Sequence, residues 1–377
     1  LIQPWHRLIF RKADYVTAIS RHLQGRALGA GVEVPIEIIP NGVDLEKFSA
    51  MGGKVERKYK IVITTSRLVK KNGIRDLIEA IRFLPTEVHL WILGDGQERL
   101  HLESQVSSLN LQNRVKFFGT VTQEEAAARL CEADVFVRPS LSEGQGISFL
   151  EAMATGVPVV GTPVGGITDF LRDGDTGVFC RPHDPQSIAK AVERFLKEPA
   201  LYGHVRENAR KLVESLYDWN TIAIRFGQLF SSLSVSAMPR VLMLASIYPP
   251  QPGGPATHAK KYVEAFRVAG FRTRLVKYVS PRWRYCLQVL NASRGADVIY
   301  AHDVTVGGLP AALLAGVMGK RLILRIGGGL LWERAAERLA TELSMLEFYR
   351  GRQYEQFKLF KLARWVLRKS DRIIVTA

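Results

Sequence analysis

Short apolar runs alternate with helix-like stretches between residues 58 and 200, and this alternation constrains the fold more than any other feature. The expected strands are Lys60–Thr65, Val88–Leu93, Val115–Phe118, Val135–Val137, Val157–Gly161 and Gly177–Phe179. The expected helices are Ile74–Phe83, Glu98–Leu109, Glu124–Ala133, Pro185–Leu196, Ala200–Leu216 and Trp219–Leu233. Strands and helices at this spacing predict a parallel sheet with helices on both faces.

The same pattern restarts after a serine-rich stretch at residues 231–237. Further strands are expected at Arg240–Ala245, Thr273–Tyr278, Val298–His302, Arg321–Ile326 and Arg372–Thr376, with a helix at Ala256–Ala269. A chain of 377 residues is long enough for two domains of roughly 150 residues each. We therefore expect an α/β protein with two Rossmann-like, doubly wound parallel-sheet domains, residues 1–235 and 236–377.

Positive charge is concentrated in the second segment. Residues 238–377 carry 23 Lys and Arg against 9 Asp and Glu, and so account for +14 of the net charge of +16. Such a domain favours an anionic partner, such as a membrane surface or a phosphorylated ligand, although a solvated basic surface gives the same composition. Basic, aromatic and aliphatic residues also mix in Tyr349–Lys369 and Arg282-Trp-Arg284, which fits either a helix on an anionic bilayer or a core helix with a basic outer side. No nucleic-acid recognition module is visible, so we expect no such partner.

Cysteine usage and hydropathy bear on the compartment. Cys131, Cys180 and Cys286 lie far apart, which predicts neither a disulfide framework nor a zinc site and favours a reducing environment. No apolar run reaches the roughly 18 residues that a membrane span requires. We expect a cytoplasmic protein, with peripheral attachment to the inner face of the membrane as a further hypothesis. Asp173-Gly-Asp175 has the spacing of a metal motif, but its setting predicts a turn, so we expect no bound metal.

The most informative local pattern is Glu143-Gly-Gln-Gly-Ile-Ser-Phe-Leu-Glu151. A strand is expected to end near Val137 and a helix to begin close to Gly146. A helix N-terminus offers unpaired N–H groups and the positive end of the dipole, and glycines let a phosphate approach the backbone. In a doubly wound sheet this loop lies at the carboxyl edge of the strands, where ligands bind. Two carboxylates around a Gly-x-Gly turn thus indicate a ligand site, with an acidic helix start that merely satisfies the dipole as the alternative.

This segment resembles the donor-binding domain of the retaining GT-B glycosyltransferases of family 4. Glu143 and Glu151 match the Glu-x7-Glu pattern of the family. Its other motifs are matched by Asn41–Phe48, Leu93–Glu98, Gly156–Val160, Gly165-Gly166, Asp173–Gly177 and Tyr217–Trp219, so that the resemblance covers residues 8–233. It implies a metal-independent, hexosyltransferase-type enzyme that moves a sugar from a nucleotide-diphosphate sugar to a hydroxyl with retention. The donor is a co-substrate, and no cofactor is implied.

The resemblance also implies roles for the matched residues. Arg67 and Glu143 would be catalytic, with Arg67 on the donor diphosphate and Glu143 orienting the sugar, while Glu151 would bind the ribose. Asn72 stands where the family usually has a Lys, so that Lys71 is the expected substitute. The remaining donor-binding residues implied are Gly144, Gln145, Gly146 and Ile147, with Gly253 and Gly254 from the second segment.

The segment from residue 239 resembles the acceptor-binding half of the family. Tyr248–His258 follows the first strand as the Gly-Gly loop of the family does. His258 and His302 would lie on the acceptor side, whereas Gly327–Gly329 supply no His or Asp at a turn where much of the family has one. The implied acceptor is a sugar or a lipid-linked hydroxyl, as in glycolipid or polysaccharide precursors. The alternatives are a nucleotide-sugar epimerase of GT-B fold and a catalytically impaired nucleotide-sugar-binding protein.

The two halves stand in the reverse of the family order. Residues 1–20 resemble the end of a preceding domain, and residues 11–20 and 368–377 both combine a helix end, an Asp and a strand. Three arrangements fit: a circular permutation, a fragment spanning two neighbouring transferases, and a fused pair without its outer halves. Met238 resembles a fresh start, and both ends stop inside the same kind of element, which favours two abutting partial transferases.

Overall fold

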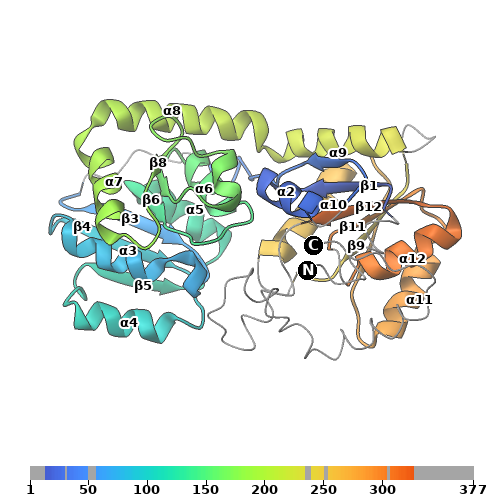
Figure 1. The fold of residues 1–377 in the computed structure, drawn as a ribbon, viewed down its shortest axis with the longest axis horizontal. Coiled ribbons are helices and arrows are strands. Elements are labelled where there is room, and N and C mark those ends of the chain that lie inside the picture. The colour runs from blue at the N-terminus through green and yellow to red at the C-terminus, as the bar shows by residue number, and fades with distance from the viewer. Residues whose placement is uncertain are drawn as a thin grey trace. The chain divides into compact units, whose positions relative to one another are not determined.

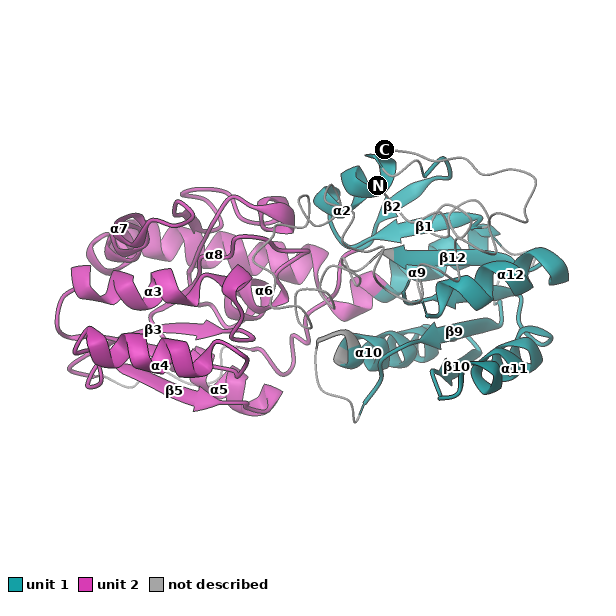
Figure 2. Ribbon diagram, turned by 60° about the horizontal axis from the view of Figure 1, so that its bottom comes forward, with its two compact units in different colours: residues 1–39, 223–377 teal, residues 40–222 magenta. Residues whose placement is uncertain are grey.

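The computed structural model describes residues 13–29, 32–49, 57–233, 239–249, 254–303 and 306–326 of the chain (Figure 1). The chain divides into two compact units, coloured differently in Figure 2. One consists of residues 40–222, and the other combines residues 1–39 with residues 223–377.

The unit of residues 40–222 is built on a parallel six-stranded sheet with the order β5-β4-β3-β6-β7-β8. Its strands are β3 (Lys60–Thr65), β4 (Val88–Leu93), β5 (Val115–Gly119), β6 (Val135–Arg138), β7 (Val159–Gly161) and β8 (Val178–Phe179). Its helices are η1 (Lys70–Asn72), α3 (Ile74–Ala80), η2 (Ile81–Phe83), α4 (Arg99–Ser108), α5 (Gln123–Glu132), α6 (Ile147–Ala154), η3 (Gly165–Asp169), α7 (Pro185–Lys197) and α8 (Pro199–Leu216). The strands expected in this region are therefore confirmed to within two residues.

Both faces of this sheet are buried. On β3, Ile61 and Ile63 pack into one hydrophobic cluster, while Val62 packs into the other. Buried parallel strands read as continuous apolar runs because helices cover each face. Side-chain caps fix two of the helix starts: Thr122 accepts the Glu125 N–H at 3.1 Å, and Asp184 accepts the Ser187 N–H at 2.9 Å.

The second unit also contains a parallel six-stranded sheet, with the order β10-β9-β11-β12-β1-β2. Its strands are β1 (Tyr15–Ala18), β2 (Ile36–Ile38), β9 (Val241–Ala245), β10 (Thr273–Lys277), β11 (Val298–Ala301) and β12 (Arg321–Ile326). Its helices are α2 (Arg21–Gly29), α10 (Gly254–Val268), α11 (Arg282–Ser293) and α12 (Gly308–Met318), with most of α9 (Trp219–Leu233). The expected strand Arg372–Thr376 and the helix candidate Tyr349–Lys369 lie outside the described residues.

An early and a late segment of the described chain thus share one sheet. β1 pairs in parallel with β12, with Tyr15 opposite Ile323. Just before β1, the Asp14 N–H donates to the Leu322 carbonyl at 2.9 Å. The Asp14 carboxylate accepts from the Leu322 N–H and from the Arg321 guanidinium, each at 2.7 Å. Residues 13–39 therefore complete the sheet that β9 to β12 begin.

The division between the units differs from the boundary expected at 235/236, because α9 packs on the second sheet. The Phe226 ring lies 5.2 Å from the ring of Tyr262 and 5.4 Å from that of Tyr300, measured between centroids. The Phe230 ring lies 4.9 Å from that of Phe266. These buried aromatic contacts hold residues 223–233 in the second unit.

Candidate functional site

The first sheet reverses its strand order between β3 and β6. From β3 the chain builds β4 and β5 on one side, then returns to place β6, β7 and β8 on the other. Ligands in open α/β sheets bind outside the carboxyl ends of the strands at such a switch point. The loops that follow β3 and β6, residues 66–73 and 139–146, carry Arg67, Lys71 and the Glu143 motif.

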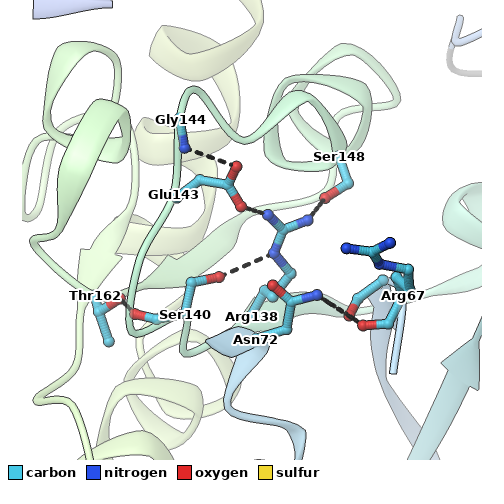
Figure 3. A network of polar contacts seen from close by, with 9 residues as sticks. Arg67, Asn72, Arg138, Ser140, Glu143, Gly144, Ser148 and Thr162 are labelled. Atoms are coloured by element: carbon cyan, nitrogen blue, oxygen red, sulfur yellow. Dashed lines mark hydrogen bonds and ion pairs between the residues drawn. The ribbon is translucent and has the colours of Figure 1, made fainter. Parts of the chain in front are cut away.

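In the loop after β3, Asn72 occupies the position where the family usually has a lysine, and its side chain holds the loop together. The buried Asn72 amide donates to the Arg67 carbonyl at 2.7 Å and to the Ser66 hydroxyl at 3.1 Å. The Lys71 carbonyl accepts the Leu141 N–H at 2.7 Å, which joins this loop to the loop after β6. Arg67 is exposed, and its side chain extends beside Asn72 toward the second loop (Figure 3). The structure therefore brings Arg67 to the carboxyl edge where the sequence predicted it.

A buried arginine that the sequence reasoning missed lies at the centre of the second loop. Arg138, the last residue of β6, donates from Nε to the Ser140 hydroxyl at 3.0 Å and from Nη1 to the Ser148 hydroxyl at 2.7 Å (Figure 3). Its Nη2 forms an ion pair with Oε2 of Glu143. Burial lowers the pKa of Arg138 to about 10, which leaves it a cation at neutral pH. An arginine that ends an apolar strand, here Val135-Phe-Val137, is the sequence signal that could have revealed it.

Glu143 is held from two sides. Its Oε1 accepts the Gly144 N–H at 3.0 Å, while Oε2 faces Arg138. Its backbone carbonyl accepts the Gly166 N–H at 3.0 Å from the loop after β7. Gly165 adopts φ +56°, and a Cβ there would lie 2.0 Å from the Glu143 carbonyl oxygen. The Gly165-Gly166 pair is thus required for the two loops to meet.

The helix that follows begins as expected. Gly146 has φ 90° and precedes α6, whose first N–H groups receive no side-chain cap from it. Glu151 follows about one turn into this helix. Burial raises the pKa of Glu151 to about 7, although the positive charges of Arg138 and Lys47 act to lower it. The loop therefore presents an uncapped helix start, an ion-paired glutamate and a second glutamate that titrates near neutrality.

The Gln145 side chain does not face the helix start. Its Nε2 donates to the Asn41 carbonyl at 3.0 Å, and its Oε1 accepts the Asn41 N–H at 2.8 Å. The side chain is buried, so only the backbone of Gln145 remains for the donor contact that the sequence predicted. This amide instead connects the loop after β6 to Asn41, which lies near the start of the same unit, residues 40–222.

The residues expected on the acceptor side lie in the second unit. His258 is on α10, and His302 follows β11 with its ring 5.4 Å from that of Tyr262. Burial, with a smaller effect of the Arg325 charge, lowers the pKa of His258 to about 4 and that of His302 well below its usual range. Both imidazoles are therefore neutral at pH 7. Gly254 begins α10, whereas Gly253 and Gly327–Gly329 lie outside the described residues.

Arg325 in β12 is a second buried arginine that the sequence reasoning did not single out as a site residue. Its guanidinium lies over the Tyr262 ring at 4.5 Å and donates to the Ile39 carbonyl at 3.3 Å. Such cation–π contacts stabilise a buried guanidinium. Arg325 thus connects the early segment of the chain to β12, and its charge adds to the effect of burial in lowering the pKa of both histidines.

Within the described residues, no group of three or more His, Cys, Asp or Glu side chains is arranged to hold a metal ion. Asp173-Gly-Asp175 forms the expected turn, in which the Gly174 N–H donates to the Gly177 carbonyl at 2.8 Å. No helix in the described part of the chain has the length and apolar character that a bilayer crossing requires.

Comparison with known proteins identifies the family. The family described as "Glycosyl transferases group 1" matches residues 50–212. The lipopolysaccharide core biosynthesis glycosyltransferase LpsE of Rhizobium meliloti is 30% identical over 232 residues, which cover 61% of this chain and 67% of that protein. The chain belongs to the group 1 glycosyl transferases. A GDP-mannose-dependent alpha-(1-6)-phosphatidylinositol monomannoside mannosyltransferase of Mycolicibacterium smegmatis is 32% identical over 245 residues, 60% of this chain and 64% of that protein.

Solved structures support the fold of this glycosyl transferase. HepE of Anabaena, in complex with UDP and glucose, is 26% identical with a TM-score of 0.54, over 59% of this chain and 64% of that one. Sucrose-phosphate synthase from Thermosynechococcus elongatus is 30% identical with a TM-score of 0.55, over 60% of this chain and 61% of that one. The chain therefore spans roughly two thirds of these relatives. Its two parallel six-stranded sheets and these neighbours confirm the expected GT-B fold.

Proposed function

We propose that this chain transfers a sugar from a nucleotide-diphosphate sugar to a hydroxyl acceptor with retention of anomeric configuration, as in family 4. The observation that carries the proposal is the convergence of Arg67, Glu143, Glu151 and the uncapped start of α6 at the switch point. The HepE complex with UDP and glucose supports a nucleotide-sugar donor, because HepE shares the fold and 26% of the aligned residues.

Each group has a distinct task in this proposal. The diphosphate is bound by the Arg67 guanidinium, the Lys71 ammonium and the first N–H groups of α6. The two side chains are cations, and the N–H groups lie at the positive end of the helix dipole. Glu151 accepts hydrogen bonds from the ribose diol, and Glu143 orients the sugar. The acceptor oxygen attacks the anomeric carbon from the face that the nucleotide leaves, while the bond from that carbon to the phosphate oxygen breaks and the diphosphate takes the hydroxyl proton. Stabilisation of the leaving diphosphate supplies most of the rate, so that no metal is needed.

The acceptor is proposed to be a glycolipid or polysaccharide precursor presented at a membrane surface. The names of two relatives support this class, because one refers to lipopolysaccharide core biosynthesis and the other to phosphatidylinositol monomannoside. The exposed Trp283 and Leu287 on α11 lie between Arg282, Arg284 and Arg294, and α11 contains no acidic residue. Exposed apolar side chains among bases suit peripheral binding to anionic lipid.

The reversed domain order is proposed to be a permutation in which one chain supplies both halves. The pairing of β1 with β12 supports it, because residues 13–39 complete the sheet of the segment that resembles the acceptor half. In this proposal residues 40–222 are the donor unit, and His258 and His302 serve the acceptor side. Two abutting partial transferases are the competing arrangement, and nucleotide-sugar transfer by the single purified chain would argue against them.

A transfer assay with two variants tests the proposed function. The chain is incubated with UDP-, GDP- and ADP-linked hexoses and a membrane extract, and sugar incorporation is measured for the parent, Arg67→Ala and Glu151→Ala. We expect Arg67→Ala to lose on the order of 100-fold in kcat/KM, the effect of removing a charge-stabilising donor. Glu151→Ala should lose about 10- to 100-fold, because hydrogen bonds to a charged group contribute about 1.5–3 kcal/mol. Arg75→Ala, an exposed arginine on α3 outside both loops, is the matched control and keeps full activity. Full activity in Arg67→Ala and Glu151→Ala would sink the proposal, and an altered sugar nucleotide formed without acceptor would indicate an epimerase.

A further inference from the structure

We propose that Arg138 is a positioning residue for sugar transfer, which holds the Glu143 carboxylate in one orientation toward the donor sugar. The inference rests on the proposed function, because it assigns a task to Glu143. It begins from the ion pair between Arg138 Nη2 and Glu143 Oε2, which joins the end of β6 to the loop that precedes α6 (Figure 3).

The fixed geometry of the guanidinium is the first argument. Nε donates to the Ser140 hydroxyl at 3.0 Å, and Nη1 donates to the Ser148 hydroxyl at 2.7 Å. Because the guanidinium is planar, these two hydrogen bonds also fix the position of Nη2. In that position Nη2 meets Glu143. A planar fork held at two corners fixes the third, which a lysine ammonium cannot do. The Ser140 carbonyl in turn accepts the Thr162 hydroxyl, so that the loop after β7 supports the same arrangement.

The remaining capacity of Glu143 is the second argument. An ionised carboxylate offers about four lone-pair sites. The Gly144 N–H occupies one on Oε1 and Arg138 occupies one on Oε2, so that each oxygen can still accept a sugar hydroxyl. The side chain of Glu143 is 15% exposed, against 9% for Arg138. Glu143 is thus the group that a ligand reaches, and Arg138 acts through it.

A double-mutant cycle separates this role from simple stabilisation of the fold. The variants are Arg138→Met, Glu143→Gln and the double variant, and the readouts are UDP affinity by calorimetry and donor turnover with the sugar nucleotide that the parent uses. We expect Arg138→Met to keep UDP affinity within about threefold at pH 9, since UDP has no sugar to contact Glu143. Turnover should fall on the order of 100-fold, as for a misplaced reacting group. The double variant should be no worse than Glu143→Gln, because residues that act as a unit are not additive.

The pH of this comparison is chosen because Arg138 also faces Glu151. Besides Arg138, Lys47 is the charged group that acts on Glu151, whose pKa is about 7. Loss of Arg138 would raise that pKa further, and a protonated Glu151 would weaken ribose binding by itself. Measurement at pH 9 favours the ionised form of Glu151 in both proteins.

Two further variants keep the inference testable if Arg138→Met does not fold. Ser148→Ala removes one fixed corner and should lower turnover by about 10-fold with UDP affinity unchanged, the effect of one lost hydrogen bond. Arg138→Lys keeps the charge and should recover only part of the turnover. Losses that add in the double variant, or UDP affinity that falls as much as turnover, would refute the role of Arg138. Failure of the parent chain to bind any nucleoside diphosphate would instead refute the proposed function.

Discussion

Glu151 is expected to make the stability of this protein depend on pH in a way that a single substitution removes. Its pKa rises from 4.5 to about 7 in the folded chain, chiefly because burial disfavours the carboxylate. A rise of that size corresponds to about 3 kcal/mol of destabilisation once the group is ionised in both states. The sign follows from proton counts. Between pH 4.5 and 7 the folded chain retains a proton that the unfolded chain has lost, so that stability falls by about 1.4 kcal/mol for each pH unit and is level above pH 7.

The perturbation is Glu151→Gln, because glutamine has the shape of the protonated acid and does not titrate. We expect the parent and the variant to have similar unfolding free energies near pH 4.5, and the variant to exceed the parent by about 3 kcal/mol at pH 8. Urea denaturation followed by circular dichroism at half-unit intervals from pH 4.5 to 8 measures the difference. Glu214→Gln, an exposed glutamate on α8, is the control and should change the difference by less than about 0.5 kcal/mol. A parent–variant difference that stays constant over this range would refute the reasoning.

Three further predictions concern the site and the packing around it. Arg67→Ala should weaken UDP binding by about 10- to 100-fold in calorimetry, because a charged donor is worth about 1.5–3 kcal/mol; Lys197→Ala on α7 should leave it unchanged. Gly165→Ala should destabilise the chain by more than about 1 kcal/mol in urea titration, since its Cβ would meet the Glu143 carbonyl oxygen at 2.0 Å; equal midpoints would contradict the tight contact. Phe230→Ala should lower the free energy of unfolding by about 3–5 kcal/mol in the same urea titration, because its ring is buried against Phe266. Ile224→Ala, on the exposed side of α9, should change it by less than about 0.5 kcal/mol.

The strands of both sheets could be predicted because each is a continuous apolar run between helical stretches. That local signal fixes β3 and β12 to the residue, but it does not say which strands become neighbours. The pairing of β1 with β12 joins residues more than 300 positions apart through Asp14 and Arg321. The assignment of residues 223–233 to the second unit depends in the same way on Phe226 and Phe230 meeting α10. Sequence separation hides both contacts, and so the division after residue 222 differs from the boundary expected at 235/236.

Around the candidate site, the placement of residues within one local segment could be predicted, whereas contacts with distant partners could not. Glu143, Gly146 and Ile147 lie in one loop and helix start, and their pattern alone indicates a ligand edge. The partner of Gln145 is residue 41, which is 104 positions away, so that its side chain could not be assigned from its neighbours. Asn72 stands where the family usually has a lysine, so that a comparison of motifs shows only a missing residue. The structure shows that its amide donates a hydrogen bond to the Arg67 carbonyl.

The two glutamates of the motif differ in their electrostatic surroundings. Glu143 has a buried cation in direct contact, whereas Glu151 feels the same cation only as an opposing field against burial. Ionisation of Glu151 is therefore unfavourable in the folded chain. Hydroxyl donors from a ribose would make it more favourable, since hydrogen bonds to a carboxylate favour its charged form. The destabilisation of the folded chain by ionised Glu151 would thus be offset when a nucleotide binds. The same substitution that stabilises the empty protein, Glu151→Gln, should then weaken the nucleotide complex, and a single guanidinium at position 138 links the two carboxylates.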